Sequence, residues 1–157
     1  AAWFTYAQQG APHRRGAIAV TLGTALTLTC VSRTGELLGG AIAASPLLAA
    51  RALASGTAAL PEVTLYDESP EIPGPIGAST ESALAAGILR SARGGLLALI
   101  NESVVEMERR DLGSPAPAIS LTGGAATAGW SAGIRADLRD PDLVVRALLA
   151  LPRSVRT

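Results

Sequence analysis

The distribution of hydrophobic positions predicts three consecutive β-strands near the start of the chain. Short apolar runs rich in Val, Ile, Leu and Thr, a composition typical of strands, occupy residues 17–22, 25–31 and 37–43. Gly23 and Thr24 form a tight turn between the first two runs, and Gly35 can supply the positive φ of the next turn. Gly39 and Gly40 interrupt the third run, which indicates a close approach to the backbone there.

Helices are predicted after these strands. Ser45 and Pro46 suit the N-cap and first turn of a helix over residues 46–54, which Gly56 ends. Asp140 is the expected N-cap of a last helix. The remaining expected elements are helices at 1–9, 125–130 and 141–151, strands at 118–121 and 135–138, an extended segment at 57–66 and an acidic surface loop at 67–77.

The longest helical pattern covers residues 80–110, as one helix or a helical hairpin, with Ser79 or Thr80 as its cap. Three glycines lie inside it, at positions 87, 94 and 95. Each costs about 1 kcal/mol relative to alanine in a helix interior. Their presence indicates a kink, close packing on a neighbouring helix, or a subunit interface where backbones come close together.

Two glycine turns are candidate sites for an anion. A turn such as Gly23-Thr24 can direct backbone N–H groups and a hydroxyl at phosphate oxygens, although an ordinary hairpin turn explains it equally well. Gly123 and Gly124 lie between a predicted strand and the start of a predicted helix, where the first N–H groups lack partners. This second signal is short and therefore weak by itself.

Composition narrows the chemistry. The chain has 157 residues and no net charge, which fits one globular domain and argues against a nucleic-acid partner. All 13 basic residues are Arg, which excludes a catalytic lysine or a lysine-containing phosphate loop. Cys30 is the only cysteine, so no disulfide or cysteine-rich metal site forms within the chain, and its place in an apolar strand predicts a small buried side chain.

Other charged groups have ordinary explanations. His13, the only histidine, stands beside two arginines and is expected to be solvated rather than catalytic. The acids of the 67–77 loop could suggest a metal site, but a solvated loop is the favoured interpretation. No apolar run approaches the length of a membrane span, so the expected location is cytoplasmic, without a membrane partner.

The predicted order of elements indicates an α/β fold. Three antiparallel strands followed by alternating helices and strands form the ribonuclease-H-like plan of the acetate-kinase/sugar-kinase/Hsp70/actin superfamily. Two such halves normally enclose a nucleotide between them. Residues 1–157 are expected to form a single domain of this kind, equivalent to the C-terminal half.

Five segments together resemble the second half of type III pantothenate kinases, in order and in spacing. They are LGTALTLTCVSRTGELLGGAIA at 22–43, GTAALPEV at 56–63, IGASTESALAAG at 76–87, TGGA at 122–125 and DPDL at 140–143. The resemblance implies transfer of the γ-phosphoryl group of ATP to pantothenate, the first step of coenzyme A synthesis. It also implies a need for Mg²⁺ and for a monovalent cation, K⁺ or NH₄⁺.

The resemblance also implies roles for particular residues. Gly23 and Thr24 would face the ATP phosphates, Gly123 and Gly124 would lie near the nucleotide, and Thr57 would lie on the pantothenate side. The long helix at residues 80–110 would form a dimer contact. No residue of this chain is assigned a catalytic or metal-binding role.

The chain departs from the family pattern where acids are expected. Thr21 and Thr29 stand at two positions that carry Asp in the family, and Ala44-Ser45 replaces Pro-Gly. The general-base Asp of the family would fall before Ala1, and residues 1–35 contain no Asp or Glu. Phosphoryl transfer needs carboxylates to hold Mg²⁺ and accept a proton, so this chain alone should not be a competent kinase.

Three functional hypotheses follow. The chain is a pantothenate kinase subunit or fragment, for which a homologous subunit or a missing N-terminal half supplies the acids in a homo- or hetero-oligomer. Alternatively, it is a non-catalytic binding or regulatory homologue that keeps the fold and the dimer surface. A sugar or acetate kinase relative is less favoured, because the GTAALPEV segment fits the pantothenate group. Whether the first half is a separate chain or was removed stays open.

Overall fold

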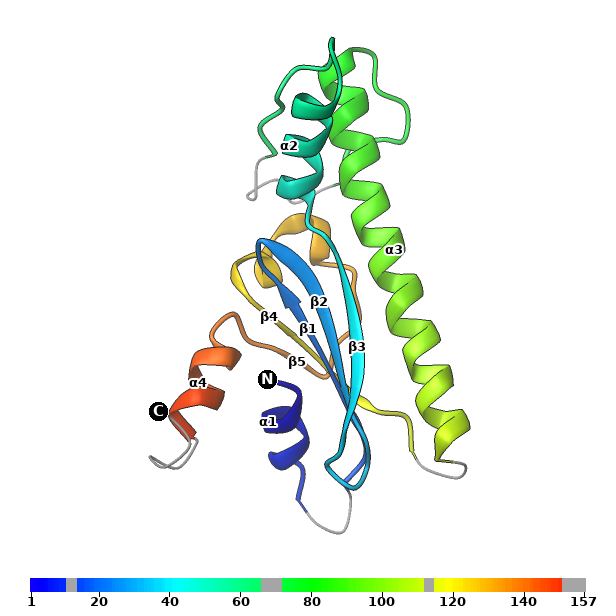
Figure 1. Cartoon of the computed structure of the whole chain (residues 1–157), viewed down its shortest axis with the longest axis vertical. Coiled ribbons are helices and arrows are strands. Elements are labelled where there is room, and N and C mark those ends of the chain that lie inside the picture. The colour runs from blue at the N-terminus through cyan, green and yellow to red at the C-terminus, as the bar shows by residue number, and fades with distance from the viewer. Residues whose placement is uncertain (11–13, 66–71, 112–114, 151–157) are drawn as a thin grey trace.

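A five-stranded mixed sheet in the order β3-β2-β1-β4-β5 forms the centre of the molecule (Figure 1). The computed structural model describes residues 1–10, 14–65, 72–111 and 115–150. The strands are β1 (Ala17–Leu22), β2 (Ala25–Val31), β3 (Leu37–Ala44), β4 (Ala118–Thr122) and β5 (Leu138–Arg139). The first three strands pair antiparallel, whereas β4 pairs parallel with β1 and with β5. This is the predicted α/β architecture of one superfamily half.

The glycine positions in the first three strands follow the prediction. Gly35 has a φ of +86°, and Gly39 has a φ of +110° beside an irregularity in the β2–β3 pairing. A Cβ atom at Gly40 would overlap the carbonyl oxygen of Leu28 in β2. The expected close backbone approach is therefore confirmed at Gly40, whereas a Cβ atom at Gly39 would meet no neighbour within 4 Å.

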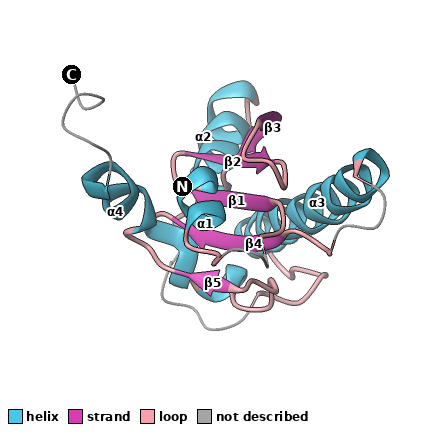
Figure 2. Ribbon diagram, turned by 90° about the horizontal axis from the view of Figure 1, so that it is seen from below, coloured by secondary structure: helices cyan, strands magenta, loops and turns pink. Residues whose placement is uncertain are grey.

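The two faces of the sheet carry different side chains, because successive residues of a strand point to opposite faces. Large aliphatic side chains such as Ile18, Val20 and Leu28 face helix α3 (Thr80–Arg110) and form the main core. Ala17 and other small residues face the opposite way, against the short helix α1 (Ala2–Ala7). Figure 2 shows α3 on one side of the sheet, with α1 and α4 (Leu143–Ala150) on the other.

Helix α3 is one continuous helix of 31 residues, which resolves the choice between a helix and a hairpin. Ser79 and Ser82 form a reciprocal capping box, so Ser79 is the cap. A Cβ atom at any of the three interior glycines would meet no neighbour within 4 Å. The expected close packing of these glycines on a neighbouring helix of this chain is therefore wrong, and the space beside them is open.

Helix α2 (Pro46–Gly56) begins at the end of β3 and rises beside α3, away from the sheet (Figure 1). The Ser45 hydroxyl accepts a hydrogen bond from the Leu48 amide at 3.2 Å, which confirms the predicted cap. Residues 57–65, expected to be extended, form no regular secondary structure.

The C-terminal elements differ from the prediction. The helix expected at 125–130 is two 3-10 turns, η1 (Gly124–Thr127) and η2 (Gly129–Ser131), and the strand expected at 135–138 is β5. The Asp140 carboxylate accepts the Asp142 amide at 3.0 Å in a turn, and α4 begins only at Leu143. Asp140 is therefore not the N-cap of α4, because its side chain accepts an amide that precedes the first residue of the helix.

Helix α3 also bears on the expectation that no segment is long and apolar enough to cross a membrane. By length and composition alone it could cross a membrane, with a mean hydropathy of 1.4 over 18 residues, of which 28% are buried. The expectation that no apolar run approaches such a length was wrong. A helix that packs on a sheet meets the same criterion, so this finding carries no conclusion about location. His13 and the three acids of the 67–77 loop, Asp67, Glu68 and Glu71, lie outside the described residues.

Candidate functional site

A cavity of about 240 Å³ lies where β1 and β4 end side by side. The two strands are parallel, and Thr21 pairs with Thr122, so the turns that follow them are neighbours. The residues that line the cavity come from both turns, the start of α2, the end of the 57–65 segment, α3 and η2: Leu22, Gly23, Thr24, Ser45, Pro46, Leu47, Leu65, Leu89, Gly124, Ala125 and Trp130. Ligands of open α/β sheets commonly bind at the carboxyl ends of the strands.

The Gly23-Thr24 turn is fixed by its own hydrogen bonds. The Gly23 amide donates to the Ala25 carbonyl at 3.2 Å, and the Ser45 hydroxyl donates to the Thr24 carbonyl at 2.7 Å. Ser45 therefore ties this turn to the start of α2 while it also caps that helix. The Thr24 hydroxyl is exposed and bonds to no described residue, so it is the polar group of this turn that a ligand can use.

The second turn depends on Gly123, whose φ of +93° is a conformation that side chains rarely adopt. A Cβ atom there would lie 2.7 Å from the carbonyl oxygen of Leu22 in β1. The Gly123 amide is used internally, because it donates to the Pro141 carbonyl at 3.1 Å. Within the described part of the chain, the amides of Gly124 and Ala125 make no hydrogen bond and remain available to a ligand.

Three of the residues singled out from the sequence share the cavity, and two do not. Gly23, Thr24 and Gly124 line it. Gly123 does not line it, but its positive φ and its contact with Leu22 determine the conformation of the turn. Thr57 follows the last residue of α2, at the end of that helix farther from the cavity, and its hydroxyl donates to Leu53 at 2.8 Å. The cavity is therefore built from the two glycine turns without Thr57.

Sequence reasoning missed the apolar residues that line this cavity. Trp130 is 5% exposed, and it lines the cavity together with Leu65 and Leu89. A tryptophan six residues after a glycine pair was the available signal. Its position depends on the two 3-10 turns, which the pattern of residues does not predict.

Comparisons with known proteins show the family of this chain. The family model for type III pantothenate kinase matches residues 2–102. The chain belongs to this family. A type III pantothenate kinase of Kosmotoga olearia is 32% identical over 142 residues, which are 90% of this chain and 50% of that protein. One of Sphingopyxis alaskensis is 31% identical over 145 residues, 92% of this chain and 52% of that protein.

This family member spans about half the length of the curated relatives it matches. A solved structure, described as a conserved putative Baf family transcriptional activator from Campylobacter jejuni, matches with a TM-score of 0.54 and 18% identity. The match covers 94% of this chain and 59% of that one. At this identity it supports the fold alone, which is a half of the superfamily fold predicted above.

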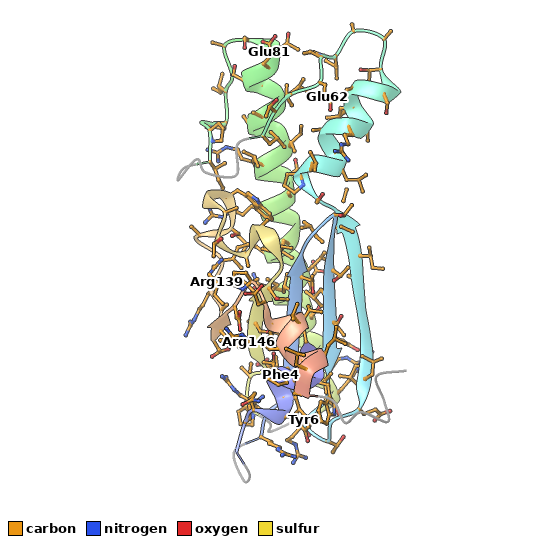
Figure 3. All side chains as sticks on the ribbon, turned by 90° about the vertical axis from the view of Figure 1, so that its left-hand side faces the viewer. Phe4, Tyr6, Glu62, Glu81, Arg139 and Arg146 are labelled. Carbon is orange, nitrogen blue, oxygen red and sulfur yellow. The ribbon has the colours of Figure 1, made fainter. Side chains whose placement is uncertain are left out.

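The pantothenate kinase family uses metal ions, but the residues of this cavity do not suit Mg²⁺, which prefers carboxylate oxygens. None of the lining residues is acidic. Glu62 and Glu81 lie at the end of the molecule remote from the sheet (Figure 3), and the described residues contain no cluster of three metal-binding side chains. Thr21 and Thr29, the positions at which the resemblance implies acids, are half-buried and lie on the α1 face of the sheet, outside the cavity lining.

Proposed function

We propose that this chain forms the phosphate-binding side of a pantothenate kinase and acts only with a partner that supplies the first half and the acids. The observation that carries the proposal is the uncharged cavity between two neighbouring glycine turns, with free amides at Gly124 and Ala125 and a free hydroxyl at Thr24. These are neutral donors of the kind that receive phosphate oxygens. They suit binding of ATP but cannot provide the charge neutralisation of phosphoryl transfer.

The partner would contribute what this half lacks. In our proposal it holds Mg²⁺ and the monovalent cation, and it carries the carboxylate that accepts the hydroxyl proton of pantothenate. Loss of such a group typically lowers the rate by hundreds-fold or more. For Thr57 we keep the weaker proposal of a contact with pantothenate, which requires the substrate or the partner to extend along α2. A cytoplasmic location remains part of this proposal.

Exposed apolar residues support a partner for this half. On the side of the sheet opposite α3, Trp3 of α1 is 56% exposed, and Val145 and Leu148 of α4 are also more than half exposed. Large side chains left in water in this way are typical of surfaces that another domain covers. We propose that the first half docks here.

A second surface suits assembly of two copies. A groove of about 530 Å³ runs between α2, α3 and the edge strand β3, and its lining is almost entirely apolar. Gly87 and Gly95 lie along it, where the absence of side chains lets another backbone approach. We therefore propose that the long helix α3 contacts the other subunit of a homo- or hetero-oligomer through this groove.

A non-catalytic binding or regulatory protein is the second candidate function. The observation that favours it is the absence of any carboxylate from the cavity lining. A chain of this kind would keep the fold and its contact surfaces, and nucleotide binding would not lead to phosphoryl transfer.

A chimera distinguishes the two candidates. The part of the Kosmotoga olearia relative that this chain does not match, about half of that protein, is joined to the chain, and ATP-dependent phosphorylation of pantothenate is measured. We expect activity that rises at least a hundredfold in Thr21→Asp and falls at least tenfold in Gly124→Val. Gly74→Val is the matched control, because a Cβ atom has open space at both glycines. An inactive chimera of the unchanged chain would reject the kinase proposal in favour of the non-catalytic one, even if Thr21→Asp with Thr29→Asp restored activity.

A further inference from the structure

One arginine anchors the wall of the cavity that residues 124–131 form. Arg139, the last residue of β5, extends its side chain behind this wall (Figure 3). Its Nη1 donates to the Ala126 carbonyl and, at 3.2 Å, to the Ser131 hydroxyl. Its Nη2 donates to the carbonyls of Ser131 at 3.1 Å and Ile134 at 3.0 Å. One guanidinium thus joins both 3-10 turns and the loop that follows them.

Ser131 works with Arg139 in the same place. Its side chain is fully buried, and its hydroxyl oxygen lies 2.9, 3.2 and 2.9 Å from the carbonyl oxygens of Ala125, Ala126 and Ala128. A hydroxyl has a single hydrogen and cannot satisfy three carbonyls at once. Backbone amides already pair with two of these carbonyls, those of Ala125 and Ala128. Arg139 donates to the third, that of Ala126, so the two side chains and the backbone together pair all three.

The partners of Arg139 distinguish it from the other arginines of this region. Its hydrogen bonds all go to neutral oxygens, whereas Arg146 of α4 pairs with the Asp140 carboxylate at 2.9 Å. A planar guanidinium with several donors in fixed directions can span several carbonyls, which a lysine ammonium cannot do. This is the use of an arginine to shape a segment of backbone rather than to balance a charge.

We propose that Arg139 is a positioning residue for the cavity, and that the hold on the Ala126 and Ser131 carbonyls sets the affinity for a nucleoside triphosphate. The proposal rests on the proposed function. The physical link is short: Gly124 and Ala125 precede the anchored Ala126, and Trp130 precedes the anchored Ser131. These three are the residues that this wall contributes to the cavity. Without the anchor, the wall loses its fixed distance from the Gly23 turn.

The test compares the binding of ATP and of adenosine to the full chain by calorimetry. Arg139→Met keeps the aliphatic stem and removes the donors, and Arg139→Lys keeps the charge but not the fork. Arg135→Met is the control, because it removes an exposed positive charge four residues away. We expect Arg139→Met to weaken ATP binding at least tenfold, Arg139→Lys to restore little of it, and Arg135→Met to change it less than twofold. Any binding of adenosine should change much less than that of ATP.

Hydrogen exchange of the ligand-free chain separates this proposal from the proposed function. Amides of residues 124–131 should exchange at least tenfold faster in Arg139→Met, whereas those of β1 should not. If the wild-type chain binds no ATP, the proposed function fails and the exchange result alone decides whether Arg139 anchors the wall. Unchanged exchange at 124–131, or equal losses of ATP affinity in Arg139→Met and Arg135→Met, would overturn the inference.

Discussion

The two faces of the sheet differ in how far this chain completes them. On the α3 face, the side chains of Ile18, Val20 and Leu22 are fully buried under a helix of 31 residues. On the other face, α1 has six residues and covers only the part of the sheet near Ala17 and Ala19. The first face is the interior of a finished domain, and the second has the character of an interface.

The difference between the two faces arises from the side chains that alternate along β1 and β2. Thr21, Thr27 and Thr29 share the open face and are half-buried, and Ile42 of β3 is 80% exposed beside Thr27. The two threonines at which the resemblance implies acids, Thr21 and Thr29, are therefore on the face that this chain leaves open. Side chains at these positions can change without disturbing the core under α3.

The largest expected effect comes from matched truncations on the two faces. Ile18→Ala should lower the free energy of unfolding by about 3–4 kcal/mol, because it leaves a cavity in a fully packed core. Ile42→Ala removes the same atoms from an exposed strand and should cost less than about 0.5 kcal/mol. Urea unfolding of both variants measures the contrast. Similar losses in the two variants would mean that the second face is covered, for example by another copy.

Gly123→Ala should follow, with a loss of about 2–3 kcal/mol in unfolding free energy. The cause is the positive φ together with the contact that a Cβ atom would make with Leu22. Gly124→Ala is the neighbouring control, because a Cβ atom there has open space. Thermal unfolding of the two variants compares them, and a Gly124→Ala variant that loses as much stability would contradict the assigned geometry.

The contact that holds α1 on the sheet should have a smaller effect. The Thr5 hydroxyl donates to the Ser120 hydroxyl at 2.8 Å, and both side chains are buried. Thr5→Val should cost about 1–2 kcal/mol, because it leaves the Ser120 hydroxyl without this partner. Adding Ser120→Ala should recover part of that loss in a double-mutant cycle. Additive losses would show that the two hydroxyls are not coupled.

The smallest expected effect is a pH dependence at the end of α3. Hydrogen bonds from Arg109 and then Arg110 lower the pKa of Glu106 to about 2. Its ion pairs therefore stabilise the fold above the ordinary glutamate pKa of about 4.3 and are lost as the pH falls toward 2. All three groups are exposed, so the effect is small and weakens with salt.

Comparison with Glu106→Gln isolates this contribution. The urea midpoint of the variant should be slightly lower than that of the wild type at pH 7 and equal to it near pH 2. A difference that persists at pH 2 or at high salt would contradict the electrostatic assignment.

The elements that depend on local pattern were predictable from the sequence. The bounds of β1 and β2 agree with the predicted runs, because alternation and turn glycines determine them. Ser45 was predicted as a cap and Ser79 was one of two candidates with Thr80, since an N-cap needs only its own helix. The neighbouring position of the two glycine turns was not predicted, because it depends on the parallel pairing of β1 with β4, two strands far apart in the sequence.

Elements that depend on distant side chains were not predictable. The helix expected at 125–130 is replaced by 3-10 turns, whose carbonyls are taken by Arg139 and Ser131. The expected strand at 135–138 is displaced, because the Asp137 carboxylate accepts the Ile119 amide at 2.7 Å. A longer β5 would have used that amide. The place of Trp130 in the cavity wall depends on these same contacts, so sequence reasoning missed it.

The central claim is that the two glycine turns form one phosphate-binding surface. The most direct measurement is a backbone amide NMR titration of this chain with ATP. The account predicts the largest shifts at Thr24, Gly124 and Ala125, and almost none at Gly94 and Gly95 on the open face of α3. Saturable shifts located elsewhere, or no shifts at these three amides at millimolar ATP, would contradict it.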